Sequence, residues 1–189
     1  FGFSMWLIEL FRAVEQALGK REIIAEDLGY MSETVRQLVR DSGFPGMKVL
    51  EFAFDSRDTG SASDYLPHNY PVNSVAYTGT HDNDTSVGWW RSLSGQDQDY
   101  VRKYLGISGE SIHWDLIHAA SASVATISIV PMQDVLGLDS PHRMNQPGQA
   151  TGYWEWRFNW NQVESWHADR LAELARLHGR SPDAPTPVT

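Results

Sequence analysis

Two stretches of the sequence end in acidic side chains that could together cleave a bond between sugars. In residues 75–85 a short apolar run leads into a turn that carries His81 and Asp82, and in residues 21–29 another apolar run leads to Glu26. An apolar run that ends in carboxylates is typical of a buried parallel strand, whose last residues emerge where α/β proteins place their chemistry. A glutamate and an aspartate from separate strands predict the carboxyl pair of glycosidic-bond chemistry.

Each of these side chains has an expected role and an ordinary alternative. Glu26 follows an apolar strand, so partial burial would keep its carboxyl protonated until it acts as a general acid. Asp82, with His81 beside it, can accept hydrogen bonds from two neighbouring sugar hydroxyls. By residue type alone, a strand-end glutamate is more often a surface or helix-capping group, and a His-Asp turn is often ordinary turn chemistry.

The elements that must position these residues alternate between strand and helix. Short apolar segments predict strands at residues 22–26, 46–52, 75–77 and 125–130, the last of them buried and stopped by Pro131. Residues 153–158 alternate between aromatic and polar side chains and could be extended. This order predicts an α/β fold with a parallel sheet of four strands.

Capping residues predict where the helices begin and end. The helix after the first predicted strand starts behind Ser32, turns Val35 inward and closes at Gly43. Asp84 or Thr85 can cap the helix that follows the His-Asp turn. The other helical periodicities cover residues 5–18, 97–105, 111–122 and 163–177.

Composition narrows the classes of protein. The chain has 189 residues, 41% of them hydrophobic, which predicts a packed globular protein, yet a complete (β/α)8 barrel needs about 250. A net charge of −9 argues against a nucleic-acid partner and against binding to anionic membranes. Cysteine is absent, which excludes disulfides, and the histidines lack zinc-ligand spacing. Because residue 1 is Phe and residues 1–8 do not have the pattern of a signal peptide, we expect a piece of a longer protein.

Several runs in order carry a resemblance to a known family. From Phe11 to His178 the chain resembles the C-terminal part of the 4-α-glucanotransferases of the amylomaltase (disproportionating enzyme) family, glycoside hydrolase family 77, relatives of the α-amylases. The matching runs are residues 24–29 (IAEDLG), 44–50 (FPGMKVL), 66–70 (LPHNY), 77–85 (YTGTHDNDT), 131–137 (PMQDVLG) and 143–145 (RMN). Residues 1–8, Gln146 and Tyr153 depart from the family pattern, which leaves fine specificity open.

The resemblance implies roles for individual residues. It makes Glu26 the general acid/base and Asp82 the stabiliser of the transition state. The residues expected to bind substrate are His81, Asn145, Asp55, Phe52 and His68, of which Phe52 would touch the acceptor sugar and His68 could instead hold its own loop. The family's nucleophilic aspartate lies on an earlier strand and matches nothing in these residues.

The same resemblance implies an architecture and partners. Residues 1–178 would form the second, C-terminal half of a (β/α)8 TIM-type barrel with extra helices, and residues 179–189 a disordered tail. The partners would be maltooligosaccharides, or α-1,4-glucans, and the missing N-terminal half of the same enzyme. A cytoplasmic location and the absence of any cofactor or metal are expected.

Four interpretations remain open at this point. The leading interpretation is a glucanotransferase, which passes a covalently held glucan to another sugar, although the isolated chain would be inactive without the nucleophile. An α-glucan hydrolase would give only shorter products from maltotriose. A catalytically silent glucan-binding fragment would bind maltooligosaccharides without turnover, and a purely structural protein would make the matching runs accidental.

Overall fold

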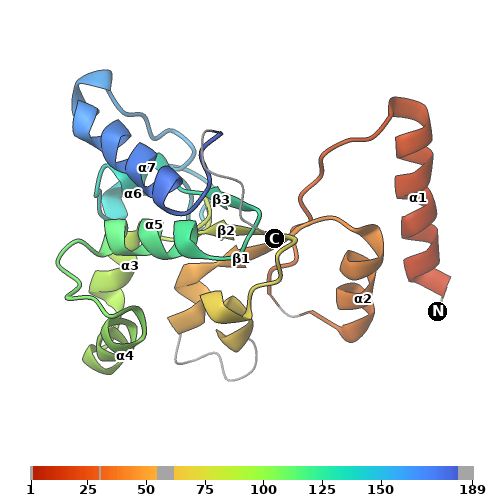
Figure 1. Cartoon of the computed structure of the whole chain (residues 1–189), viewed down its shortest axis with the longest axis horizontal. Helices are drawn as coiled ribbons and strands as arrows, with labels where there is room; N and C mark the ends of the chain where they lie inside the picture. Colours follow the sequence, from red (N-terminus) through yellow and green to blue (C-terminus); the bar gives the residue numbers. More distant parts are fainter. Residues whose placement is uncertain (1, 30, 55–61, 183–189) are drawn as a thin grey trace.

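Three short parallel strands form the centre of the molecule. The computed structural model describes residues 2–29, 31–54 and 62–182. The strands β1 (Gly46–Val49), β2 (Ser74–Tyr77) and β3 (Ile127–Ile129) lie side by side in that order, and both pairs are parallel. Helices separate the strands along the chain and pack beside the sheet (Figure 1). The predicted α/β fold with a parallel sheet is confirmed.

The first predicted strand is present only as a single bridge. Ala25 pairs with Gly46 at the start of β1, and its N–H donates to the Pro45 carbonyl at 2.9 Å. The rest of residues 22–26 does not pair, so the expected strand there is wrong, and the described sheet has three strands rather than four. A strand forms only where a neighbour offers continuous hydrogen bonds, and β1 begins too late to pair with Glu22 or Ile23.

Two other strand predictions need correction. The strand expected over residues 46–52 ends at Val49 and continues as a 3-10 helix, Leu50–Phe54, which turns Leu50 and Phe54 into the core. The strand expected over residues 125–130 is limited to β3, and the side chains of Ile127 and Ile129 are exposed rather than buried. In the described part of the chain β3 is an edge of the sheet, and the face that carries Ile127 and Ile129 is left uncovered.

The caps predicted for two of the helices are confirmed. They are α1 (Gly2–Leu18), α2 (Glu33–Ser42), α3 (Ser86–Ser92), α4 (Gly95–Leu105), α5 (Ile112–Ala122), α6 (Met132–Val135) and α7 (Ser165–Leu177). Ser32 accepts a hydrogen bond from the Val35 N–H, and Gly43 ends α2 in the left-handed conformation at φ 69°. Of the two predicted caps for α3, Thr85 is the one that accepts from the Gly88 N–H, at 3.1 Å. No strand forms at residues 153–158.

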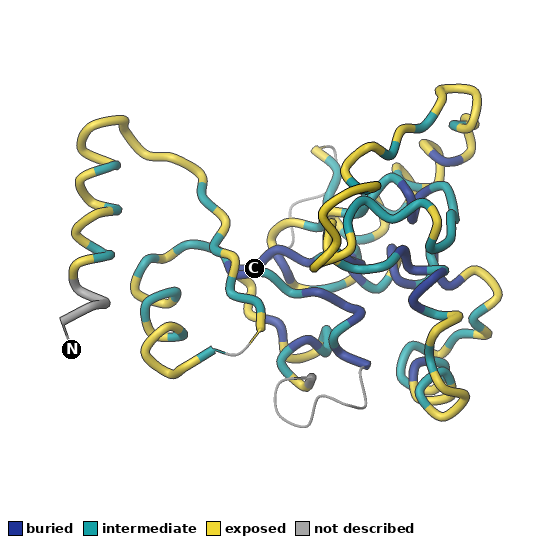
Figure 2. Tube along the Cα trace, turned by 180° about the vertical axis from the view of Figure 1, so that it is seen from behind, coloured by how far each residue is buried: buried dark blue, intermediate teal, exposed yellow. Residues whose placement is uncertain are grey.

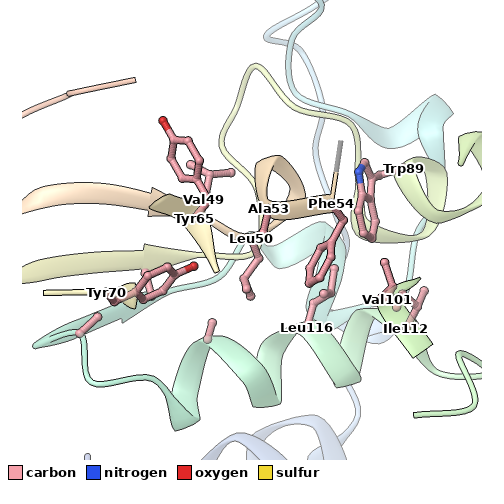
Figure 3. Packing of buried hydrophobic residues seen from close by; sticks show 13 residues of the cluster. Val49, Leu50, Ala53, Phe54, Tyr65, Tyr70, Trp89, Val101, Ile112 and Leu116 are labelled. Carbon is pink, nitrogen blue, oxygen red and sulfur yellow. The ribbon is translucent and has the colours of Figure 1, made fainter. Parts of the chain in front are cut away.

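The core lies between the sheet and helix α5. Leu50, Phe54 and Leu116 are fully buried and pack together there (Figure 3). A second cluster joins Trp114 and Ile117 of the same helix to α6 and α7. The buried residues therefore follow the strands and α5, whereas the N-terminal helix is largely exposed (Figure 2). This core fixes the carboxyl ends of β1 and β2, which carry the polar residues of interest.

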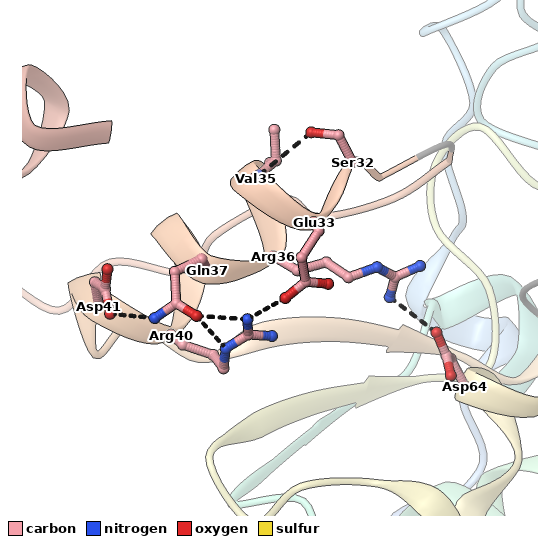
Figure 4. Close-up of polar contacts among 8 residues, drawn as sticks. All are labelled: Ser32, Glu33, Val35, Arg36, Gln37, Arg40, Asp41 and Asp64. Atoms are coloured by element: carbon pink, nitrogen blue, oxygen red, sulfur yellow. Dashed lines mark hydrogen bonds and ion pairs between the residues drawn. The ribbon is translucent and has the colours of Figure 1, made fainter. Parts of the chain in front are cut away.

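Helices α1 and α2 stand beside the body of the molecule rather than on its core (Figure 1). Polar contacts along α2 link Arg40 to Glu33 and to Gln37, and Arg36 ties the helix to Asp64 at 2.9 Å (Figure 4). Val35, which was expected to face inward, is exposed, since no described core element covers α2. A hollow of about 550 Å³ opens between α1 and the amino ends of the strands. None of the helices in the described ranges is long and apolar enough to cross a membrane.

Candidate functional site

The turn after β2 is shaped by its own polar side chains. The Asn83 Oδ1 accepts hydrogen bonds from the Thr80 N–H at 3.0 Å and from the Thr80 hydroxyl at 2.7 Å. The Asn83 N–H in turn donates to the Thr80 carbonyl at 3.2 Å. Asparagine and threonine favour such local bonds over regular structure. The result is a closed turn that leaves His81 and Asp82 at its exposed tip.

A distant loop clamps this tip. The Asn145 Nδ2 donates to the Asp82 Oδ1 at 2.6 Å, and the Arg143 Nη2 donates to the Asp82 carbonyl at 2.9 Å. The Asn145 N–H also donates to the His81 carbonyl at 3.1 Å, and the His81 Nε2 lies 3.4 Å from the Asp82 Oδ1. Three residues expected to act on substrate, His81, Asp82 and Asn145, are therefore brought together. The Asp82 side chain keeps 49% of its surface exposed, so it remains accessible to a ligand.

Trp154 borders the same tip and was not singled out from the sequence. Its ring centroid lies 5.0 Å from that of His81, and 56% of the residue is exposed. It is the single non-glycine residue with positive φ, at 68°, in the described part of the chain, and its N–H donates to the Met144 carbonyl at 2.8 Å. Backbone strain of this kind is often retained at functional sites. The alternating aromatics of residues 153–158 predicted an extended strand, so the sequence did not indicate the left-handed backbone of Trp154 or its contact with His81.

Two carboxyl groups, the buried Asp134 and the half-buried Asp84, support the turn from below. The Asp134 Oδ2 accepts from the Thr78 hydroxyl at 2.5 Å, and its Oδ1 accepts from the Ser86 N–H at 2.8 Å. Burial raises the pKa of Asp134, although these hydrogen bonds act in the opposite direction. Asp84 accepts from the Thr85 N–H and from the Ser140 hydroxyl, each at 2.7 Å. Helix α6 and the loop after it are thus tied to both ends of the turn.

Glu51, two residues past the end of β1, is a second buried carboxyl beneath the turn. Only 3% of the residue is exposed, and its Oε1 has no hydrogen-bond partner within the described ranges. Burial, followed by the nearby Asp134 and Asp84, raises the pKa of Glu51 well above its usual range, against the influence of Asn83 and Arg143. The sequence signal was a lone acidic residue in an apolar run, which we had assigned to an ordinary strand.

A cavity of about 210 Å³ opens at the carboxyl ends of β2 and β3. Residues of the turn line one side of it, including His81 and Asn83, and Arg143 and Met144 line another. Gln133 and Asp134 form its inner wall. The cavity is small for an oligosaccharide, but it adjoins the exposed tip of the turn. It gives a ligand that reaches Asp82 a recess to enter.

Glu26 lies elsewhere along the sheet and is exposed, so the expected partial burial is wrong. It sits one residue past the bridge to Gly46, and only β1 flanks it in the described structure. The neighbouring Asp27 points inward instead: its Oδ1 accepts from the Met47 N–H at 2.6 Å. The hydrogen bonds and ring contacts of the described residues do not join Glu26 to Asp82.

The remaining predicted binding residues have other surroundings. Phe52 is half-buried and packs edge-to-face on Tyr65, with ring centroids 5.3 Å apart. The His68 Nδ1 lies 2.8 Å from the Tyr104 hydroxyl, in a hollow that shares no lining residue with the cavity below the turn. The structure therefore does not bring His68 to the Asp82 tip. Asp55 lies outside the described residues.

No group of three His, Asp or Glu side chains that could hold a metal ion occurs in the described ranges. A carboxylate fixed by an amide, beside an imidazole and an exposed indole, can bind neighbouring hydroxyls and an apolar ring face together. Those are the two surfaces that a pyranose ring offers.

Comparison with known proteins gives consistent matches. Residues 4–163 match the family described as 4-alpha-glucanotransferase. The chain is 50% identical over 175 residues to a 4-alpha-glucanotransferase of Synechocystis sp., covering 91% of the chain and 34% of the relative. It is 41% identical over 180 residues to that of Thermus thermophilus, covering 91% and 35%. The chain thus spans about a third of the length of these relatives.

The chain is also similar to solved structures of amylomaltases. Amylomaltase from Streptococcus agalactiae, solved in complex with acarbose, superposes with a TM-score of 0.84 at 36% identity. The match covers 92% of this chain and 35% of that one. Amylomaltase from Corynebacterium glutamicum, at a TM-score of 0.60 and 16% identity, shares the fold over 86% of the chain.

Proposed function

The chain belongs to the 4-alpha-glucanotransferase family, and we propose that it forms part of an enzyme that transfers α-1,4-glucan segments between maltooligosaccharides with retention of configuration. The observation that carries the proposal is the clamped turn, in which Asp82 is fixed by the Asn145 amide at 2.6 Å beside His81. A retaining transferase needs a carboxylate that grips the sugar more strongly as its ring flattens. Asp82 is held in place for that role and remains accessible.

The two steps of the reaction assign the other roles. In the first step, Glu26 gives its proton to the leaving glycosidic oxygen while a nucleophilic carboxylate bonds to the anomeric carbon. In the second, Glu26 takes the proton of the acceptor's 4-hydroxyl, which displaces the carboxylate. We assign the nucleophile to a part of the enzyme other than residues 1–189. His81 and Trp154 contribute a hydrogen bond and an apolar face to the bound sugar.

The architecture that we propose is the C-terminal half of a (β/α)8 barrel over residues 1–178, followed by a terminal segment. The expected disorder of residues 179–189 does not hold for Arg180, whose guanidinium donates to the Ser121, Ser123 and Ala125 carbonyls. The parallel order of β1, β2 and β3, with polar residues at their carboxyl ends, supports this placement. Closure with the other half would cover the exposed face of β3 and bring Glu26 toward Asp82. The substrate would then lie over the carboxyl ends of the strands. We place the enzyme in the cytoplasm.

The test uses the complete enzyme and maltotriose. A transferase yields glucose together with maltodextrins longer than maltotriose, whereas a hydrolase yields only shorter products. Products are separated by chromatography at early times, with Asp82→Asn as the inactive comparison. Longer maltodextrins that vanish in the variant support the proposal. Shorter products alone would replace it with hydrolysis, and saturable maltooligosaccharide binding without any turnover would replace it with a silent glucan-binding protein.

A further inference from the structure

Glu51 touches the base of the turn that carries His81 and Asp82. A Cβ atom placed on Gly79 would lie 2.9 Å from the Glu51 Oε1 and 3.2 Å from the Asn83 Cβ. Glycine at position 79 therefore makes room for the carboxyl, which lies against the first residue of the turn and close to the asparagine that closes it. The group belongs to the scaffold of the site rather than to its exposed surface, because 97% of the residue is buried.

The charges around Glu51 do not favour a carboxylate there. Asp134 faces it from α6 and Asp84 from the end of the turn, and both are acidic. Arg143 is the cation that faces it, but its guanidinium donates to the Asn145 carbonyl at 2.6 Å and to the Asp82 carbonyl at 2.9 Å. A buried carboxylate without a paired cation or a full set of donors is strongly disfavoured. An uncharged carboxyl, with one O–H donor and one carbonyl acceptor, suits the position better.

We propose that Glu51 is a positioning residue that acts as an uncharged carboxylic acid, filling the space beneath Gly79 and Asn83 and so holding His81 and Asp82 in register. For its effect on activity the proposal rests on the proposed transferase function. Glutamine has the same length and also offers one donor group and one carbonyl oxygen. Glutamine can therefore replace Glu51, whereas alanine leaves a void and an ionised glutamate repels Asp84 and Asp134.

The pH dependence follows from the direction of the pKa. Burial and the two aspartates raise the pKa of Glu51 in the folded protein above its unfolded value. Its contribution to stability is therefore complete below the ordinary pKa of a glutamate and is lost as the pH rises through the raised folded value. Asp134 has a raised pKa as well and adds a slope of the same sign. Only the difference between the wild type and Glu51→Gln isolates Glu51.

The first experiment measures maltotriose disproportionation by the complete enzyme. We expect Glu51→Ala to lower kcat by about 10- to 100-fold with a smaller change in KM, because a displaced turn misplaces Asp82. Glu51→Gln should restore kcat to within about threefold at pH 7 and weaken the decline of kcat at alkaline pH. Glu110→Gln, on an exposed loop after α4, is the matched control for loss of one negative charge.

The second experiment measures urea unfolding of the wild type and Glu51→Gln between pH 5 and pH 9. The variant should gain stability relative to the wild type as the pH rises, whether or not the enzyme transfers glucan. If the wild type transfers no glucan, the proposed function fails and unfolding alone decides the role of Glu51. Equal slopes in both proteins, full activity of Glu51→Ala, or a loss of more than 100-fold in Glu51→Gln would each overturn the inference. The last outcome would indicate that a charged or proton-transferring glutamate is needed. If Glu51→Ala fails to fold, the Glu51→Gln comparison still tests the proposal.

Discussion

Replacing Asn145 with alanine tests whether the loop clamp serves the chemistry of Asp82. The substitution removes the amide that donates to the Asp82 Oδ1 at 2.6 Å. It leaves the backbone link from the Asn145 N–H to the His81 carbonyl, so the loop keeps its attachment. The Asp82 carboxylate then loses the donor that fixes its orientation. The expected effect is on the transition state, where Asp82 is proposed to act.

The magnitude follows from the exposure of the pair. A hydrogen bond to a charged group contributes about 1.5–3 kcal/mol, but the Asp82 side chain is 49% exposed, so water and salt screen the interaction. We therefore expect a loss of about 1–1.5 kcal/mol in transition-state stabilisation. This corresponds to a fall of about 5- to 12-fold in kcat/KM. Most of it should be a fall in kcat, since the contact with Asp82 strengthens as the sugar ring flattens.

The assay is a double-mutant cycle on the complete enzyme with maltotriose. Asn145→Ala is measured in the wild type and in Asp82→Asn, which itself should lower kcat more than it changes KM. If Asn145 acts through Asp82, its removal should cost less than about twofold in the Asp82→Asn background. Gln149→Ala, at an exposed position of the same loop, is the control and should stay near wild-type rates. Equal losses in both backgrounds would refute the coupling and make Asn145 an independent contact with substrate.

Three further substitutions have clear expected outcomes. Glu26→Gln should lower maltotriose transfer about 10²–10⁴-fold, while maltooligosaccharide binding measured by calorimetry persists. A glucosyl fluoride donor should partly restore the rate, and unchanged turnover of maltotriose would exclude Glu26 as the acid/base. Gly79→Ala should lower both kcat and the urea concentration at the midpoint of unfolding, because the new methyl group would lie 2.9 Å from the buried Glu51 Oε1. An unchanged midpoint would show that the turn can shift to accept the methyl group without loss of stability. Arg180→Ala should lower the free energy of unfolding by about 2–3 kcal/mol, because the guanidinium donates to the Ser121, Ser123 and Ala125 carbonyls at 2.7–2.9 Å. A loss below about 0.5 kcal/mol would show that these hydrogen bonds contribute little to stability.

Local chemistry explains why the caps and the turn could be predicted from the sequence. Ser32 caps α2 and Thr85 caps α3 through bonds that span three residues, so nearby sequence determines them. The apolar run before the His81-Asp82 turn likewise contains its own signal for a buried strand. These features depend on few distant partners. Their residue types therefore predicted both the element and its boundary.

Features that depend on distant partners were harder to predict. Glu51 and Asp134 stand 83 positions apart, and neither position indicates alone that both carboxyls lie beneath one turn. Trp154 lies against the His81 ring and has a φ of 68°, and the local sequence indicates neither feature. The exposure of β3 depends on which strand lies beside it, and an apolar run cannot specify that. Tertiary contacts, rather than propensity, determine these parts of the site.

The final prediction concerns residues 1–189 made as a separate chain, which we expect to transfer no glucan. Retaining cleavage needs a second carboxyl group about 5–5.5 Å from the acid/base. Asp27 neighbours Glu26 in sequence, but its Oδ1 is held by the Met47 N–H at 2.6 Å. Glu51 and Asp134 are buried, and Asp82 shows no contact with Glu26 among the described residues. With Asp82 assigned to the transition state, none of these four carboxyl groups is left for the role of the nucleophile.

The separate chain exposes apolar surface, so its association state provides a second test of this prediction. Ile127 and Ile129 of β3 are exposed along an edge of the sheet, and Leu10 and Leu18 are exposed on α1. Such surface favours association, so we expect the chain to sediment as more than a monomer and to bind a hydrophobic dye. Adding the remaining part of the enzyme, made separately, should reduce dye binding and restore maltotriose disproportionation together. Steady production of maltodextrins by the mass-verified chain alone would refute this reasoning, because it would require a nucleophile within residues 1–189.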